Sequence, residues 1–347
     1  MHRYLNIALD TDLQEKLEKV RDSSLRDIAL RNLSEIQAQR NEDKKRFESL
    51  TPIARRRNSI RNTIEKKVVK DDERYHVHSV LAMCGLPYRK PAAGMNTYHR
   101  EYGKNSLIVQ SGFLKDPITG LIREQGLPYG PKARLLMLHI CTLAVRQKSR
   151  EIELADSLSG LIRDLGFSVT GGEKGTIGLF KEQLKRLAAA RMLIGLWNGD
   201  HSRTINTQPI KSFDIWVSSD PDQPTLWSNS LTLDYDFYES LKQHALPVDI
   251  RAVSAFTNSA KQIDLFLWLA YRLNKLHKPY IFSWQLLLEQ FGTDVKAKRN
   301  FRKAFKDDLS AILEVFPKLT AKLTEDGLKL YPVEPEKLFV LPHYRRS

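Results

Sequence analysis

The sequence predicts an α+β fold, mostly helical, with two tandem winged helix-turn-helix domains preceded by a basic helical N-terminal region. Apolar residues mostly recur at helical spacing, one order of elements occurs twice, and a positively charged segment precedes both copies. A chain of 347 residues that is 41% hydrophobic can bury cores for two or three domains, which excludes a disordered or fibrous protein. We expect a charged helical region over 1–75, with partial disorder as an open alternative, a first winged-helix domain with an N-terminal extension over 76–220, and a second over 221–347.

The N-terminal region combines helical periodicity with positive charge. Apolar residues from Leu13 to Ile36 follow helical spacing with one phase slip, which predicts a helix over 12–40. An amphipathic helix on the body of the protein is favoured over a short coiled coil, because too few clean heptads follow one another. Between Lys44 and Lys70, ten Lys and Arg residues face only two acidic ones, which indicates a basic arm or linker; a solvated face and a localisation signal stay open. Thr51 before Pro52 can start a helix here.

The first copy of the repeated pattern follows a stretch punctuated by Gly and Pro from Gly85 to Gly130. Its predicted elements are a helix after Pro131, a short strand over 151–154, a helix over 158–165 capped by Asp156 or Ser157 and stopped at Gly166, a helix over 176–190, and strands over 192–197 and 210–217 joined by a long polar loop. A connection over 218–234 and a helix over 235–244 follow.

The second copy repeats this order. A helix over 263–273, a strand over 279–282, a helix after Ser283 that ends at Gly292, and a long basic helix from Lys296 come in succession. Two strands, 319–324 and 328–331, then flank Asp326-Gly327, a dipeptide typical of tight hairpins. Helix, strand, helix, helix and hairpin is the order of a winged helix-turn-helix.

Net charge points to polyanionic partners. The formal charge of +14 and a pI near 9.6 favour nucleic acid over an acidic membrane surface. In a helix-turn-helix the second helix of the motif enters the major groove, so basic residues on the outer faces of the long helices are the candidates for DNA binding. No acidic residue lies between Lys296 and Lys306, whereas Glu182 interrupts the corresponding row of the first copy. The predicted DNA-binding residues are Lys174, Thr176, Lys181, Lys185, Arg186, Arg203, Lys211, Lys296, Lys298, Arg299, Arg302, Lys303, Lys306, Lys322 and Lys329.

Enzymatic motifs are weak. His76-Val77-His78 matches the metal-binding tripeptide of nicking enzymes, with Tyr98 or Tyr102 as nucleophile, but a surface or linker pair is the favoured interpretation. The turn around Lys174-Gly175-Thr176 lacks the Gly-Lys-Ser/Thr order of a phosphate loop. Asp234 and Asp236 are better explained by a helix N-terminus, and His139 by a partly buried core position. We therefore expect no enzyme, no metal site and no cofactor.

The sequence lacks the patterns typical of disulfide-bonded, secreted or membrane-spanning proteins, and this predicts its cellular compartment. Cys84 and Cys141 supply neither a disulfide framework nor a zinc motif, which favours a reducing cytoplasm. No stretch is apolar enough to span a membrane, and the first residues lack the pattern of a secretory signal. We expect a soluble cytoplasmic protein without a membrane partner.

Several ordered blocks resemble one family. Leu127-Pro128-Tyr129-Gly130, Lys148-Ser149-Arg150-Glu151-Ile152-Glu153-Leu154, Leu165-Gly166 and Thr170-Gly171-Gly172 closely resemble plasmid-encoded RepA replication initiators of the IncW type, over about 81–331. The resemblance implies a bacterial initiator that binds origin repeats (iterons) as a monomer, helps to open an AT-rich segment and brings in the host initiator and replicative helicase. It also implies a dimer that represses its own promoter, and tandem winged helices. Residues 1–75 lie outside the matching blocks.

Two classes of function stay open besides the initiator. A nicking endonuclease using His76, His78 and a tyrosine would cut DNA in a metal-dependent way and form a covalent product. A plain winged-helix repressor would bind duplex DNA without strand opening. Residue patterns alone do not separate the repressor from the initiator.

Overall fold

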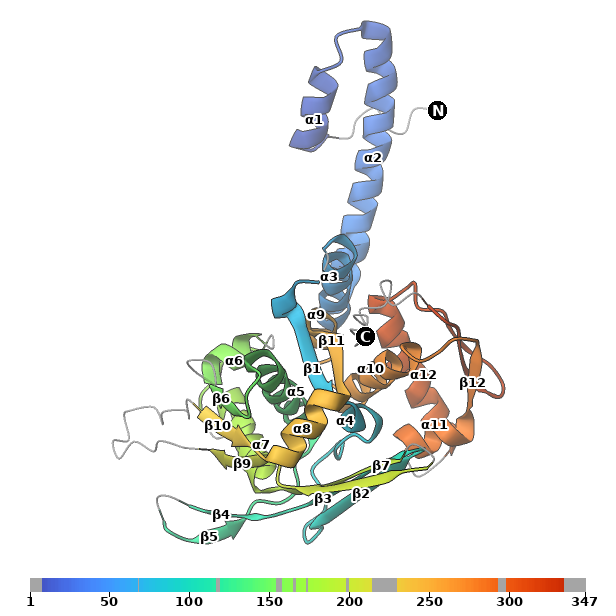
Figure 1. Cartoon of the computed structure of the whole chain (residues 1–347). Coiled ribbons are helices and arrows are strands. Elements are labelled where there is room, and N and C mark those ends of the chain that lie inside the picture. Colours follow the sequence, from blue (N-terminus) through green and yellow to red (C-terminus); the bar gives the residue numbers. More distant parts are fainter. Residues whose placement is uncertain are drawn as a thin grey trace. The chain divides into compact units, whose positions relative to one another are not determined.

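The chain folds into two compact units, Met1–Ser59 and Ile60–Ser347. The structure, a computed structural model, describes residues 8–67, 69–116, 119–153, 158–164, 167–172, 174–197, 200–213, 230–292 and 298–333. It is α+β, as the sequence predicts, with several small sheets among the helices (Figure 1). The predicted boundaries near residues 75 and 220 stay predictions.

The first unit is a helical hairpin rather than one helix. α1 (Thr11–Glu18) and α2 (Ser23–Ser49) replace the continuous helix expected over 12–40. The chain reverses because Asp22 caps a new helix by accepting from Ser24 N at 2.9 Å. Leu13 is buried, and the Asp10 amide donates to Gln37 Oε1 at 2.8 Å, so the start of α1 is fixed to the middle of α2. The phase slip in the sequence marks this reversal.

α3 (Pro52–Lys66) begins where the sequence predicts. The Ala54 amide donates to Thr51 Oγ1 at 3.3 Å, and Pro52 occupies the first helical position, where no amide hydrogen is needed. In the second unit, Ile60 and Ile64 pack against the hydrophobic core. The basic segment from Lys44 to Lys67 is thus largely helical.

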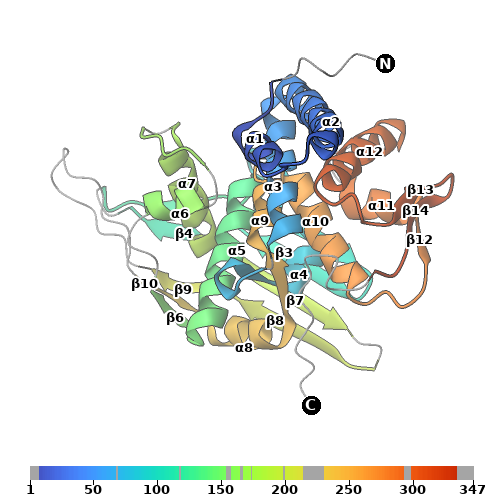
Figure 2. The ribbon, with the colours of Figure 1, turned by 90° about the horizontal axis from the view of Figure 1, so that it is seen from above.

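The second unit is organised around two helices, α5 (Gly130–Gln147) and α10 (Ala260–Leu273). The remaining helices are η1 (Asp71–Glu73), α4 (Ser79–Met83), α6 (Leu158–Asp164), α7 (Thr176–Ala189), α8 (Tyr235–His244), α9 (Ile250–Ser254), α11 (Trp284–Phe291) and α12 (Lys298–Val315). Figure 2 shows α6 and α7 on one side of the central pair and α11 and α12 on the other.

A buried ion pair joins the two central helices. The Arg134 guanidinium donates from Nε and Nη2 to the two carboxylate oxygens of Asp264 at 2.6 and 2.7 Å, and both side chains are 5% exposed. Arg134 also donates to the carbonyls of Pro87 and Gly130 at 3.1 and 2.9 Å. The two halves of the repeated pattern therefore share one core.

The sheets are all antiparallel, and most pair strands far apart in sequence. Their strands are β1 (Arg74–His78) with β11 (Ala245–Asp249); β2 (Thr97–Tyr102), β3 (Asn105–Gln110), β7 (Arg191–Trp197) and β8 (Ser202–Thr207); β4 (Phe113–Lys115) with β5 (Ile122–Glu124); β6 (Glu151–Glu153), β10 (Ser230–Leu233) and β9 (Ile210–Phe213); and β12 (Tyr280–Ser283), β14 (Gly327–Leu330) and β13 (Ala321–Leu323). The four-stranded sheet lies along one side of the unit, below α4 and α8 in Figure 1.

The second copy of the pattern follows the predicted order of elements. Ser283 Oγ accepts from Leu286 N at 3.3 Å and caps α11, which ends before Gly292. β13 and β14 form the expected hairpin, and β12 pairs with β14. Gly327 has φ +155°, and a Cβ there would lie 2.0 Å from the Phe282 carbonyl oxygen, so only glycine fits this approach of two strands.

The first copy departs from the prediction after its third helix. The expected polar loop between two strands is wrong, because Ser202–Thr207 form β8, which pairs with β7. Ile205 and Thr207 are buried in this mainly polar segment, and that alternation supports the strand. β7 also pairs with β3, so this hairpin belongs to the four-stranded sheet. Three parts of the prediction for this copy lie outside the described residues: the caps Asp156 and Ser157, the stop at Gly166, and residues 214–229.

His76 and His78 are not a surface or linker pair, contrary to the expectation. They lie in β1, opposite Pro247 and Ala245 of β11. His78 is fully buried: its Nδ1 accepts from Val80 N at 3.2 Å and its Nε2 bonds Ser240 Oγ at 2.9 Å. His139 is buried, as expected. Burial lowers the pKa of His76 and His139 to about 4 and that of His78 to about 3, with smaller contributions from nearby positive charges.

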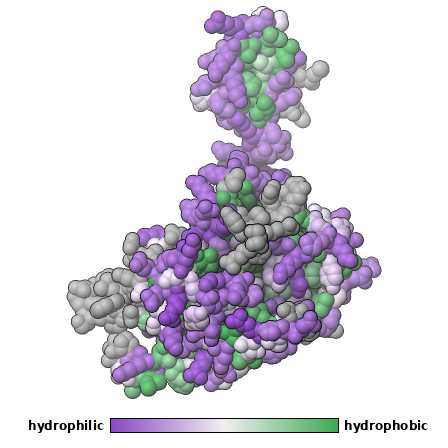
Figure 3. All heavy atoms as spheres, in the orientation of Figure 1, coloured by the Kyte–Doolittle hydropathy of each residue, from purple (hydrophilic) through white to green (hydrophobic). Residues whose placement is uncertain are grey.

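The surface is mainly polar. Hydrophilic residues predominate on the face shown in Figure 3, with separate small apolar patches between them. In the part of the chain that the structure describes, no helix combines the length and apolar character needed to cross a membrane.

Candidate nucleic-acid interface

α12 separates apolar and basic residues onto different faces. Phe301, Phe305 and Leu309 are 2–3% exposed and pack into the core. Arg302, Lys303 and Lys306 are exposed. Lys298 and Arg299 stand in the first turn of α12, their side chains are not among those described, and Lys296 lies outside the described residues. The described outer face of this part of α12 therefore presents three cations to solvent.

An aromatic ring supports Arg302. Its guanidinium carbon lies 5.0 Å from the centre of the Trp284 ring, a distance suited to a cation–π contact. The Trp284 indole donates from Nε1 to the Thr324 carbonyl at 3.3 Å, and its ring meets Phe305 edge-on. The sheet thus fixes the ring, and the ring restrains Arg302 while leaving it exposed.

The β13–β14 hairpin carries two lysines at one register position. Lys322 faces Lys329 directly across the strands. Like charges in this arrangement destabilise a sheet, and a bound polyanion removes that repulsion. The Lys329 ammonium also lies 5.2 Å from the centre of the Tyr331 ring. The hairpin therefore adds a second cationic element beside the helices of this copy.

The predicted residues of α7 are divided between solvent and structure. Lys174 and Lys185 are exposed. Lys181 is half-buried, and burial together with the charge of Lys185 lowers its pKa. Thr176 Oγ1 donates to the Ser168 carbonyl at 2.7 Å, which holds the preceding loop on the helix start.

Arg186 is the most enclosed of these candidates. Its side chain is 14% exposed, and it bonds Glu182 and donates to the Leu127 carbonyl at 3.1 Å. The guanidinium also lies 5.2 Å from the centre of the Tyr129 ring. These contacts attach α7 to the segment before α5 and engage the cation internally.

Arg203 and Lys211, two further candidates of the first copy, lie on strands of different sheets. Arg203 is exposed on β8, in the four-stranded sheet, and Lys211 is exposed on β9. The structure thus brings together Arg302, Lys303 and Lys306 on one helix, but it does not gather the first copy's candidates on one helix and hairpin.

The family model described as "Plasmid encoded RepA protein" matches residues 127–286. This part of the chain is similar to the plasmid-encoded RepA family. The match begins at the Leu127-Pro128-Tyr129-Gly130 block on which the predicted resemblance rests, confirms that resemblance and supports a plasmid replication initiator.

The RepA match has clear limits in the fold. It includes α5, α7 and the β7–β8 hairpin and ends within α11, so α12 and its hairpin lie beyond it. A solved structure titled "Crystal structure of SeMet derivatives of domain2 and domain 3 of RctB" is similar to this chain with 9% identity and a TM-score of 0.44, covering 67% of this chain and 85% of that one. No curated protein matches the chain.

Sequence reasoning missed the aromatic rings that lie against two of the candidate cations. Trp284 stands against Arg302, and Tyr331 against Lys329. A local signal was available only for Tyr331, which follows Lys329 by two residues in the predicted hairpin. Sequence reasoning also missed Lys104 and Lys275, which line a cavity with Arg203. Their proximity depends on strand pairing over long separations, which no local pattern encodes.

Proposed function

We propose that this protein is a plasmid replication initiator that binds repeated duplex sequences at its origin through two winged-helix domains. Binding helps to open an AT-rich segment and brings in the host initiator and replicative helicase. A dimer of the same chain represses its own promoter. This activity takes place in the bacterial cytoplasm and involves no catalysis by the protein.

The exposed basic face of α12 carries this proposal. Arg302, Lys303 and Lys306 point away from a buried apolar row, and no acidic residue lies between Lys296 and Lys306. A helix placed in the major groove meets bases with its first turns and phosphates with its flanks. Arg302, on its aromatic support, suits bidentate contact with guanine.

The hairpin and the first copy supply further phosphate contacts. Lys322 and Lys329 suit the backbone beside the groove that α12 enters. Lys174 and Lys185 of the first copy are available to a second segment of the same duplex. Two such contacts on one face of the DNA give a protected region of about two helical turns.

The histidine geometry favours binding over nicking. Both ring nitrogens of His78 already have partners inside the protein, so a metal bound there would displace the bonds to Val80 and Ser240. Among the described residues, no group of three or more His, Cys, Asp or Glu side chains is arranged to hold a metal ion. The bonds made by His78 support a binding function over a nicking enzyme that uses this histidine.

DNase footprinting on the DNA that flanks the gene tests the proposal. The full chain is used at two salt concentrations, and the products are also separated on a denaturing gel. We expect regularly spaced protected repeats, intact strands and protection that weakens steeply with salt.

The other outcomes reject the initiator in distinct ways. One protected operator without repeats indicates a plain repressor. A discrete metal-dependent nick with a covalent protein–DNA product indicates a nicking enzyme that uses His76, His78 and a tyrosine.

A further inference from the structure

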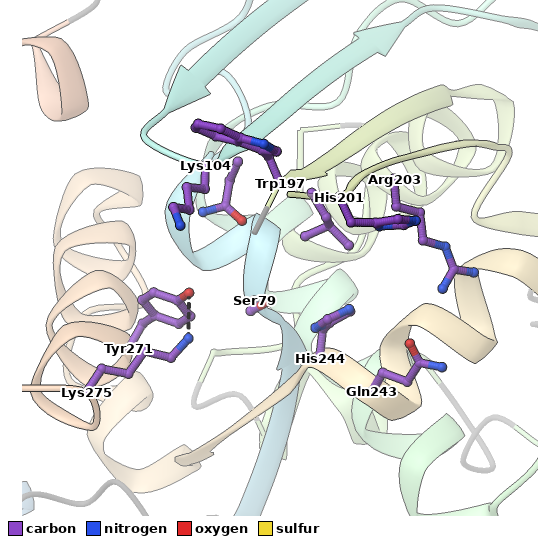
Figure 4. Close-up of a pocket in the computed structure, with 11 residues that line it drawn as sticks. Ser79, Lys104, Trp197, His201, Arg203, Gln243, His244, Tyr271 and Lys275 are labelled. Carbon is purple, nitrogen blue, oxygen red and sulfur yellow. Dashed lines mark hydrogen bonds between the residues drawn. The ribbon is translucent and has the colours of Figure 1, made fainter. Parts of the chain in front are cut away.

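A cavity of about 490 Å³ opens beside the end of the β7–β8 hairpin. Its volume lies within the range of about 300–1,000 Å³ that is typical of small-ligand sites. Figure 4 shows side chains from several elements around one space. The side chains that matter for its chemistry are Lys104, Trp197, Arg203, His244, Tyr271 and Lys275.

The lining is strongly cationic. Lys104, Arg203 and Lys275 are exposed, and no Asp or Glu stands among the lining residues that the structure describes. Burial and the charges of Arg203 and Lys275 lower the pKa of His244, so its ring is neutral near pH 7. The C-termini of α8 and α10 contribute about half a negative charge each. Three full positive charges exceed that amount, and the cavity attracts anions.

The same cavity offers an aromatic face. Trp197 is 51% exposed although it is large and apolar. Its backbone amide donates to the Lys104 carbonyl at 2.9 Å, which fixes the tryptophan next to the lysine. The Lys104 ammonium lies 5.5 Å from the centre of the Trp197 ring. The exposed ring face is available for stacking.

A second pair of cation and ring stands on the α10 side of the cavity. The Lys275 ammonium donates to the Tyr271 hydroxyl at 2.9 Å and lies 4.3 Å from the centre of that ring. Figure 4 shows this pair and Lys104 bordering the same space. The tyrosine holds Lys275 in place without neutralising its charge.

Aromatic faces beside fixed cations match the two parts of a nucleotide, because bases stack on rings and phosphates bind ammonium and guanidinium groups. We propose that this cavity binds a single nucleotide, with the base on Trp197 and the phosphate held by Lys104 and Lys275, and with Arg203 on the opposite wall. The nucleotide is either free or one unit of a single DNA strand. This site uses residues other than those assigned to the duplex, apart from Arg203, and so goes beyond the proposed function.

Binding by the purified full chain tests this site with two probes, adenosine monophosphate and a short single-stranded oligothymidylate. Tryptophan fluorescence and calorimetry follow the titration. We expect saturable binding that is weakened about tenfold by Lys104→Ala, Lys275→Ala or Trp197→Ala. Trp197→Phe should keep most of the affinity and lose most of the fluorescence change.

Lys242→Ala is the matched control. Lys242 lies on α8 next to the lining residue Gln243, but its ammonium bonds Glu239 at 2.8 Å and it does not line the cavity. This variant removes the same charge and should bind both probes like the unaltered protein. Because Lys104 and Lys275 are exposed, the test variants should fold normally, which circular dichroism checks.

The two probes separate the sources of the nucleotide. Binding of adenosine monophosphate identifies a free nucleotide, and binding of the oligothymidylate alone identifies a strand. The site is overturned if neither probe binds. It is also overturned if the Lys104 and Lys275 variants bind the probes as tightly as the unaltered protein does. Equal losses of nucleotide and duplex binding in these variants overturn it too, because the cavity then belongs to the duplex interface. A protein that binds a probe but protects no duplex repeat refutes only the initiator proposal.

Discussion

The two copies of the helix, strand, helix, helix and hairpin pattern reach different structures. In the second copy, β12, β13 and β14 form a sheet of their own, and the basic face of α12 stays exposed. In the first copy, the hairpin after α7 joins β2 and β3, and Arg186 of α7 is engaged with Glu182 and Leu127. The same local pattern thus yields a free basic helix in one place and a partly internal one in the other.

The difference teaches that the neighbours of a module decide what its helices can bind. β2 and β3 precede the first copy, and β3 pairs with β7 of its hairpin. In the described part of the chain, β14 of the second copy pairs with β12 and β13 of that same copy. One edge of β3 pairs with β2, and the other edge is open to β7, so the hairpin joins a larger sheet. We therefore expect the second copy to dominate sequence-specific binding.

The largest expected effect concerns the ion pair that joins the copies. Arg134→Ala leaves the buried Asp264 carboxylate without its partner and should lower the free energy of unfolding by about 3–5 kcal/mol. Because α5 and α10 share one core, both copies should lose stability together in chemical denaturation. Arg163→Ala, an exposed change in α6, should stay within about 0.5 kcal/mol. Two separate transitions, with only one shifted, would show that the copies fold independently.

We expect acid to destabilise the part of the core around β1 and α5 before the part around α11 and α12. His76, His78 and His139 have folded pKa values of about 4, 3 and 4, below the ordinary value of 6.5. The unfolded chain then binds more protons, so stability is complete above about pH 6.5 and falls as the pH drops toward 4. For the buried His78 the loss is about 2 kcal/mol at pH 5.

Hydrogen exchange at pH 7 and pH 5, corrected for the intrinsic exchange rate, measures this effect. We expect greater loss of protection in β1 and α5 than in α11 and α12, where the described residues include no buried histidine. The charged groups near His76 and His139 include Arg146, and His244 lies near His78. Uniform loss across both copies would contradict the localised effect.

The contrast between Arg302 and Arg186 gives the next prediction. Arg302→Ala should weaken specific duplex binding by about 1–3 kcal/mol if the contact is to a base, and Arg299→Ala likewise. Arg186→Ala should change binding less, because its guanidinium is already bonded inside the protein. Affinities for the protected repeat at one salt concentration measure both. Normal affinity in both the Arg302 and Arg299 variants would show that these residues of α12 do not contact bases.

The long helices of the second unit were predictable from sequence, and its four-stranded sheet was not. Local spacing sufficed for α5, α7, α10 and α12, and Asp326-Gly327 marked the last hairpin. β2 and β3 lie in a stretch rich in Gly and Pro, and β3 pairs with a strand that begins only at Arg191. Such pairing is decided by tertiary packing, which no local period records.

The candidate site was predictable by residue type but not by environment. The basic row of α12 is visible in the sequence, and Arg302, Lys303 and Lys306 are indeed exposed. The enclosure of Arg186 depends on the backbone carbonyl of Leu127, an acceptor that every residue type possesses. The burial of His78 likewise depends on β11 and α8, which come far later in the chain.

The smallest expected effect decides whether the first copy touches DNA at all. Each lysine that contacts a phosphate adds about 0.9 to the slope of log affinity against log salt. Lys322→Ala in the hairpin and Lys185→Ala in α7 should each reduce the slope by about that amount, and Lys181→Ala by less, because Lys181 is half-buried. Titrations of the protected repeat over a series of salt concentrations measure these slopes. If only Lys322→Ala reduces the slope, α7 does not contact phosphate; the first copy then contributes its sheet and the shared core, and the second copy alone binds the duplex.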